Sequence, residues 1–196
     1  MGGVSPDDKI DDIPAKEVSD FVVVNTPRYL TRFKTMNDKK KKSWNWGAFL
    51  FPEAWYFYRK MYLPGILFFV LTVTASLLGL SYLNLVNELP MEAQRNYSTL
   101  ANYIVANAET LNLVPLYLAS AGLVLELALR VISGLMGDKI YRKTVLAGVR
   151  LVKSREDEEE LPLNLALRHK GGVNMLMGVV GLFGVQWITT ILFSFI

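Results

Sequence analysis

The sequence predicts an all-α polytopic membrane protein with three transmembrane helices, an interfacial or re-entrant aromatic helix before the first, and a basic amphipathic helix after the second. Of the 196 residues, 52% are hydrophobic and the mean hydropathy is +0.26, more apolar material than a soluble core of this size needs. The apolar residues are gathered into long blocks flanked by cations. Three such blocks define the predicted fold.

Each of the three blocks is long enough to cross the roughly 30 Å hydrocarbon core as a helix. The predicted spans are residues 64–86, 111–137 and 173–196. The first span carries no charge, whereas the second carries one acidic and one basic residue. Small residues allow helices to approach closely in a membrane, so we expect glycines to mark the packing faces. The glycines concerned are Gly79, Gly178, Gly181 and Gly184.

The segment before the first span has the composition of a membrane interface. Trp and Tyr rings favour the level of the lipid headgroups, and clustered lysines favour an anionic leaflet. As a helix, residues 44–58 would measure only about 22 Å, so we expect this run to lie on the surface or to re-enter. The residues predicted to contact lipid headgroups are Lys39, Lys40, Lys41, Lys42, Trp44, Trp46, Trp55, Arg59 and Lys60.

The chain divides by composition into three predicted regions. Residues 1–20 are acidic and polar, and we expect them to be disordered because they bury too little apolar surface. Residues 21–63 form a cytoplasmic or interfacial basic-aromatic segment, and residues 64–196 form the helical membrane domain. Within that domain, residues 138–153 have the pattern of a basic amphipathic helix, and the acidic run at 156–160 is predicted to be a solvated loop.

The cations predict how the chain is oriented. Eleven of the 21 Lys and Arg residues precede Pro64 and eight lie within residues 138–172, whereas the polar loop at 87–110 contains only Arg95. The positive-inside rule therefore places the N-terminus and the loop after the second span in the cytoplasm, and the C-terminus outside. Cations that flank apolar blocks do not form a nucleic-acid-binding surface, so we expect no nucleic-acid partner.

One acidic residue lies inside a predicted span, and it is the main candidate for chemistry. Placing an ionised Glu126 near the bilayer centre costs at least about 2.5 kcal/mol on insertion scales, so it needs a partner or a function. Arg130, one helical turn later, is a candidate for a structural ion pair. The alternative is a mid-membrane polar site for a proton or a small solute. The predicted members of that site are Glu126, Arg130, Gln186 and Ser76. Measured from the cytoplasmic helix ends, Glu126, Ser76 and Gln186 lie at similar depths of about 16 to 20 Å.

Composition also limits the possible chemistry. The chain has no cysteine and a single histidine, His169, which excludes thiolate metal sites, disulfides and thiol nucleophiles. It contains no zinc-protease helix, serine elbow, phosphate-binding glycine loop or nucleotide fingerprint. We therefore predict a protein without catalytic residues, metal or cofactor.

Three short segments resemble a bacterial family. They are Ser-Trp-Asn-Trp-Gly-Ala-Phe at residues 43–49, Tyr-Arg-Lys-Met-Tyr at 58–62 and Asp-Lys-Ile-Tyr-Arg-Lys at 138–143. Together they resemble domain-of-unknown-function family 2628, a family of small integral membrane proteins, over about residues 21–153. The resemblance implies a helical protein of the bacterial inner membrane and brings no activity with it. Some relatives look as if they carry an N-terminal zinc ribbon, which a chain without cysteine does not have.

Two functions fit these observations. The leading hypothesis is a non-enzymatic scaffold or accessory subunit of the inner membrane, bound to anionic lipid headgroups and to partner helices, either of another protein or of further copies. The alternative is an oligomeric transporter or channel component with a polar site around Glu126.

Overall fold

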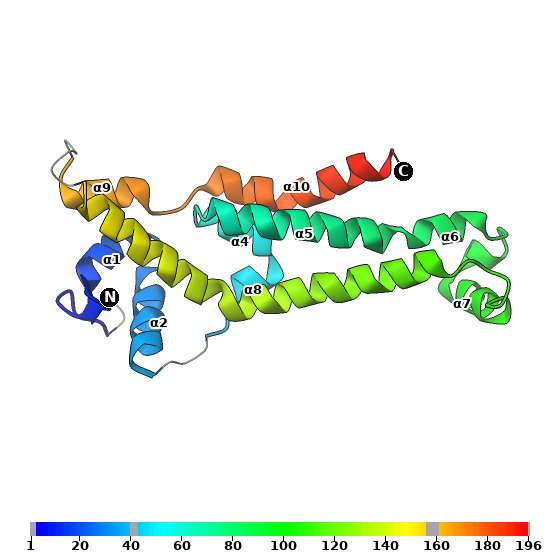
Figure 1. Ribbon diagram of the computed structural model, residues 1–196, viewed down its shortest axis with the longest axis horizontal. Helices are drawn as coiled ribbons and strands as arrows, with labels where there is room; N and C mark the ends of the chain where they lie inside the picture. Colours follow the sequence, from blue (N-terminus) through cyan, green and yellow to red (C-terminus); the bar gives the residue numbers. More distant parts are fainter. Residues whose placement is uncertain (1–2, 40–42, 156–160, 196) are drawn as a thin grey trace. The chain divides into compact units, whose positions relative to one another are not determined.

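The computed structural model describes residues 3–39, 43–155 and 161–195, which are mostly helical (Figure 1). Strand β1 (Lys9–Ile10) pairs antiparallel with β2 (Ile13–Pro14) near the N-terminus. The predicted all-α class is confirmed. The helices are α1 (Ala15–Val22), α2 (Thr26–Lys39), α3 (Trp46–Leu50), α4 (Pro52–Tyr58), α5 (Tyr62–Leu80), α6 (Tyr82–Glu88), α7 (Tyr97–Ala106), α8 (Val114–Lys153), α9 (Leu163–Lys170) and α10 (Met175–Phe193), with a 3-10 turn at Ala93–Arg95.

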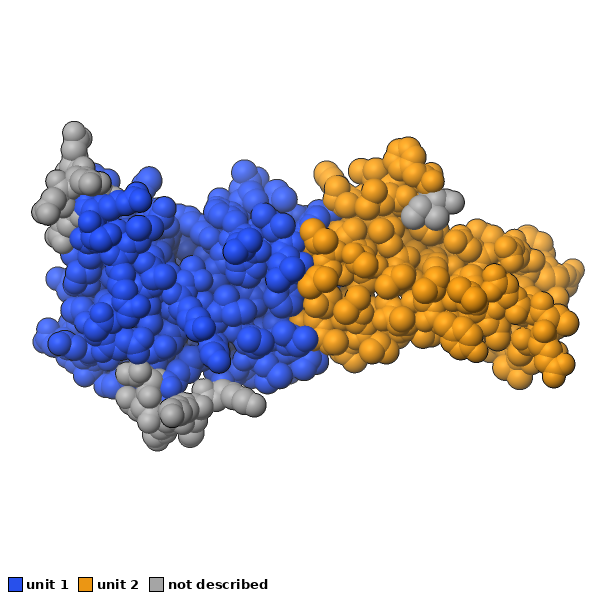
Figure 2. All heavy atoms as spheres, in the orientation of Figure 1, with its two compact units in different colours: residues 1–69, 130–184 blue, residues 70–129, 185–196 orange. Residues whose placement is uncertain are grey.

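The chain forms two compact units (Figure 2). Unit 1 comprises residues 1–69 and 130–184, and unit 2 comprises residues 70–129 and 185–196. Helices α5, α8 and α10 each contribute residues to both units.

Three segments of the described chain are long and apolar enough to cross a membrane, as predicted. They are Tyr62–Glu88, Val114–Lys153 and Leu163–Phe193. Most residues of their most apolar windows are not buried by protein, since the buried share is 28%, 22% and 17%. Lipid is the environment that suits such surfaces, because apolar side chains gain free energy by leaving water.

Residues 138–153, predicted to form a basic amphipathic helix after the second span, are helical and belong to the same helix as that span. Helix α8 continues without a break for 40 residues, from Val114 to Lys153. Its C-terminal part keeps the expected two faces, since Val145 and Val149 are buried whereas Lys139 and Lys143 are exposed. The helix continues through Gly137 and Asp138 because this glycine packs closely on Ala48 and the aspartate is bonded to other elements rather than to the helix end.

The acidic N-terminus also differs from the prediction, because it is folded from Gly3 onward. Ile10, Ile13 and Val18 are each at most 3% exposed, and Phe21 at the end of α1 lies against Gly148 of α8. Single apolar residues among aspartates are thus enough to anchor this segment when a neighbouring helix supplies the rest of the core. We call residues 3–39 the N-terminal layer.

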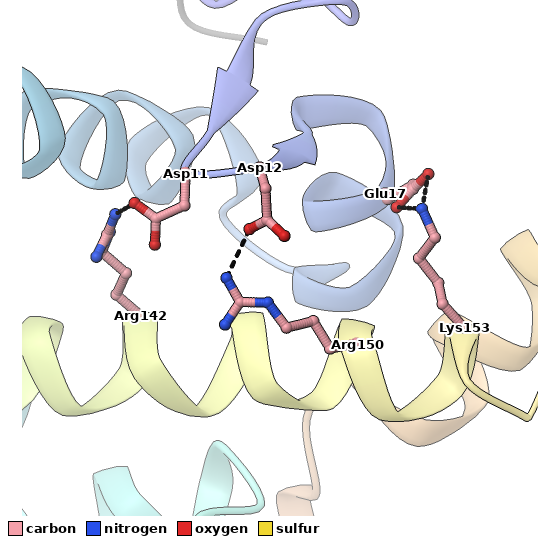
Figure 3. Close-up of polar contacts among 6 residues, drawn as sticks. All are labelled: Asp11, Asp12, Glu17, Arg142, Arg150 and Lys153. Carbon is pink, nitrogen blue, oxygen red and sulfur yellow. Dashed lines mark hydrogen bonds and ion pairs between the residues drawn. The ribbon is translucent and has the colours of Figure 1, made fainter.

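Carboxylates of the N-terminal layer lie against cations of α8, as Figure 3 shows. The pairs with α8 are Asp11–Arg142, Asp12–Arg150 and Glu17–Lys153. Asp8–Lys34 and Asp20–Arg168 are two further pairs. The hydrogen bond from Arg150 lowers the pKa of Asp12, and that from Lys34 lowers the pKa of Asp8. Both carboxylates therefore favour the folded layer at neutral pH and lose that effect only as the pH falls through their lowered pKa values.

The loop between the first two spans is structured within unit 2. Asn96 caps α7 by accepting a hydrogen bond from the Thr99 amide at 3.0 Å, and the Thr99 hydroxyl accepts one from the Asn96 amide. Beneath this capping box, Leu85, Leu89 and Ala93 form a small buried apolar cluster. The cluster explains why a segment with polar composition is helical here.

A buried carboxylate joins three elements of unit 1. Asp138 of α8 is fully buried, and it accepts hydrogen bonds from Ser43 at 2.6 Å and Asn45 at 2.7 Å and an ion-paired one from Arg32 of α2. The Asn45 side chain also caps α3 by accepting from the Ala48 amide at 3.2 Å. One acidic side chain therefore fixes α2 and the start of α3 on α8.

Replacing Asp138 by alanine should destabilise unit 1 strongly. The substitution removes the acceptor of three hydrogen-bond donors. One of them, the side-chain amide of Asn45, would lose this bond while the residue is only 1% exposed. We expect a loss of about 3 kcal/mol in the free energy of unfolding, measured by denaturant titration of the detergent-solubilised protein. Asp7→Ala, at an exposed aspartate, is the matched control and should lose less than about 0.5 kcal/mol. Equal losses for the two variants would contradict the assignment.

Candidate functional site

Three of the four residues predicted for the mid-membrane site surround one cavity of unit 2. Ser76 of α5, Glu126 of α8 and Gln186 of α10 line a space of about 510 Å³. Ser120 and Thr189 add two hydroxyl groups to the wall. Each of the three long helices therefore contributes polar atoms to the same space, although its use as a binding site stays a prediction.

A glycine that sequence reasoning missed lets two of these helices meet. A Cβ atom at Gly122 of α8 would lie 2.5 Å from the Ala75 carbonyl oxygen and 2.6 Å from the Gly79 nitrogen, so only glycine fits there. Glu126 is one turn further along the same face of α8, and it lines the cavity together with Ser76 of α5. In the sequence, the glycine four residues before Glu126 was the available signal that a helix packs on this face of α8.

Arg130 is the predicted member that does not line the cavity. Its guanidinium donates a hydrogen bond to the Leu50 carbonyl within unit 1. In the cavity wall, the Thr189 hydroxyl is buried and has no hydrogen-bond partner among the described residues. The wall thus presents one carboxyl, one amide and several hydroxyls, a donor and acceptor set that suits a proton, water or a small polar or cationic solute.

Two of the predicted headgroup contacts are interior residues instead. Arg59 is only 4% exposed, and its guanidinium lies 4.5 Å from the ring centre of Tyr29 and 5.0 Å from that of Tyr141. It also donates hydrogen bonds at 3.2 Å to the Tyr141 hydroxyl and the Val24 carbonyl. Trp55 is 9% exposed and its ring packs edge-on against Tyr141. Aromatic rings of unit 1 therefore stabilise this cation in place of lipid phosphates.

The other predicted headgroup contacts have different positions. Trp46 is 60% exposed, and Trp44 is half-buried with its ring 5.1 Å from that of Phe49. Lys60 is partly exposed, and burial together with the charge of Lys170 lowers its pKa. Lys40 to Lys42 and the acidic run at 156–160 lie outside the described residues, and only the backbone of Lys39 is described.

The glycines predicted for helix packing have two kinds of surroundings. In unit 1, Cβ atoms at Gly178, Gly181 and Gly184 would lie within 3.1 Å of residues of α4 or α5, so α10 packs closely on both. A Cβ atom at Gly79 would meet no described atom within 4 Å, because that side of the residue faces the cavity. Where α5 meets α8, the close contact is between the backbone of Gly79 and Gly122.

Alanine substitutions at the two facing glycines should have opposite effects. Gly122→Ala forces a methyl group into the backbone of α5 and should cost about 1 to 3 kcal/mol of unfolding free energy. Gly79→Ala enters open space and should stabilise the helix by about 0.5 to 1 kcal/mol. Denaturant titration in detergent measures both. A loss at Gly79 as large as that at Gly122 would show that α5 and α8 do not cross at these residues.

The described residues contain no group of three or more His, Asp or Glu side chains placed to hold a metal ion. Two other features of the described residues bear on function: the cavity among the apolar helices of unit 2 and the buried polar residues of unit 1.

Comparison with known proteins gives a family but no activity. No curated protein and no solved structure matches the chain. The family model described as Protein of unknown function (DUF2628) matches residues 15–146, about two thirds of the chain. The match runs from the start of α1 into the C-terminal part of α8, so it includes Arg59, Glu126 and Asp138 but not α10. The chain therefore belongs to the DUF2628 family.

Proposed function

We propose that this protein is a non-enzymatic scaffold or accessory subunit of the bacterial inner membrane. The observation that carries the proposal is the unbroken helix α8. Its first half is an apolar membrane-length segment, and its second half carries the folded N-terminal layer through buried side chains and three ion pairs. A membrane-length helix that continues into a folded layer suits a protein that holds partners in place at the membrane.

The distribution of cations supports a cytoplasmic position for that layer. By sequence, unit 2 contains a single Lys or Arg residue, Arg95, whereas unit 1 contains all the others. The positive-inside rule then places the N-terminal layer and residues 138–170 in the cytoplasm, the loop containing Arg95 outside, and the C-terminus outside. Anionic lipid headgroups are the expected partners of the basic residues near the inner surface.

The spans offer surface for partner helices. Tyr117 of α8 is 67% exposed and Phe183 of α10 is 54% exposed, among many other apolar side chains on the same helices. A partner membrane protein or a second copy of this chain would cover part of this surface by van der Waals packing.

Photo-crosslinking in native membranes tests the scaffold proposal. A photoreactive phenylalanine analogue at Tyr117 or Phe183 replaces an exposed aromatic side chain with one of similar size. We expect a protein adduct of defined mass at one or both positions, either with a single partner or with a second copy. Tyr97, which is 92% exposed in the loop between the first two spans, is the control and should give no such adduct. Lipid adducts alone at both test positions would contradict the proposal.

The cavity of unit 2 favours a second candidate, a transporter or channel component. Its specific support is that Ser76, Glu126 and Gln186 come from three apolar helices yet line the same space. Because the described part of the chain has three membrane-length helices, we expect a transport pathway to require several copies.

Proton flux into liposomes distinguishes this candidate from the scaffold. If the cavity conducts protons, Glu126→Gln should abolish the flux because the amide does not titrate. Glu109→Gln, at an exposed residue of unit 2 that does not line the cavity, should conduct like the parent protein. If neither the parent protein nor the variants conduct, the transport candidate fails and the scaffold proposal is unaffected.

A further inference from the structure

An apolar groove in unit 1 lies between α4 and the first half of α10. It encloses about 490 Å³, and none of its lining residues is charged. Phe51, Trp55 and Tyr58 form one wall, and Val179 and Leu182 form the other. Phe51, Val179 and Leu182 are each between 44% and 52% exposed, so the groove is open to its surroundings. An open apolar groove on a membrane-length helix is suited to a hydrocarbon chain.

One end of this groove is cationic. The Asn174 amide donates a hydrogen bond to the Tyr58 carbonyl at 2.8 Å, which holds the start of α10 beside the end of α4. Two residues beyond Tyr58, Lys60 adopts a left-handed conformation with φ 57° and donates to the His169 carbonyl at 3.2 Å. Its ammonium group therefore lies beside the basic end of α9, where Lys170 is the next residue.

The charge of Lys60 is destabilised at this end of the groove. Burial and the nearby charge of Lys170 lower the pKa of Lys60, which means that the protonated form is less favourable here than in water. An anion placed between the ammonium groups of Lys60 and Lys170 would instead favour the protonated form of Lys60. The groove thus combines an apolar channel with a cationic end, the two features that match an anionic amphiphile.

We propose that this groove binds an anionic phospholipid, with one acyl chain along Trp55, Tyr58 and Val179 and the phosphate against Lys60 and Lys170. A partner helix would use the apolar walls but would not explain the two lysines at one end, so the charge pattern favours a lipid. The inference rests on the proposed membrane location but not on the scaffold role.

Native mass spectrometry of the purified, delipidated full chain tests the proposal, with phosphatidylglycerol and phosphatidylcholine as probes. We expect one phosphatidylglycerol to bind per chain, more tightly than phosphatidylcholine. Val179→Trp fills the groove from an exposed position and should remove this lipid. Val180→Trp is the matched control, because Val180 is 47% exposed and does not line the groove, and it should bind like the parent protein.

A second variant tests the cationic end without filling the groove. Replacing Lys60 and Lys170 by glutamine should weaken phosphatidylglycerol binding by about 30-fold, the effect of removing two cations near an anionic headgroup, and leave phosphatidylcholine binding unchanged. Equal binding of the two lipids by the parent protein, or equal loss in the Val179 and Val180 variants, overturns the proposal. Resistance to carbonate extraction, measured in parallel, shows whether the chain is integral to the membrane, so a chain that resists extraction but binds no lipid in the groove refutes this inference alone.

Discussion

Apolar side chains that no protein covers impose the constraint on which the rest of this structure depends. The three long helices bury less than a third of their most apolar windows. At about 25 cal/mol for each Å² of apolar surface, leaving such helices in water would cost far more than the net stability of a typical domain. Lipid removes this cost, and a helix satisfies its own backbone hydrogen bonds within the lipid. Polar side chains in or near these helices must then be paired, or serve a purpose.

Asp138 and Arg59 are two of the buried charged residues of unit 1. Asp138 accepts hydrogen bonds from Arg32, Ser43 and Asn45. Arg59 lies against aromatic rings and donates to a hydroxyl and a carbonyl, whereas its Nε is buried without a hydrogen-bond partner among the described residues. Removing the contacts of a buried charge is costly, so these contacts fix one arrangement of the surrounding helices rather than adding much net stability. This gives α8 a defined surface for the N-terminal layer, which is the basis of the scaffold proposal.

Features governed by local composition could be predicted from the sequence, whereas features that depend on distant partners could not. Block hydropathy predicts the three long helices, and helical depth places Ser76, Glu126 and Gln186 at one level. The N-terminus is held by residues far along the chain, which are Gly148 against Phe21 and the ion-pair partners Arg142 and Arg150. The two arginines follow their aspartates by 131 and 138 residues, so no local pattern reveals the order of this segment. The interior position of Arg59 could not be predicted for a similar reason, because the two rings beside it, Tyr29 and Tyr141, come from different helices.

The central claim is that the helices cross a membrane with the N-terminal layer on one side and the loop containing Arg95 on the other. Because the chain has no cysteine, single cysteines at Lys143 and Ser98 can be labelled selectively. In sealed, right-side-out membrane vesicles, a membrane-impermeant maleimide should label Ser98→Cys, whereas Lys143→Cys should react only after the vesicles are opened. Equal labelling of both positions in sealed vesicles would contradict the account.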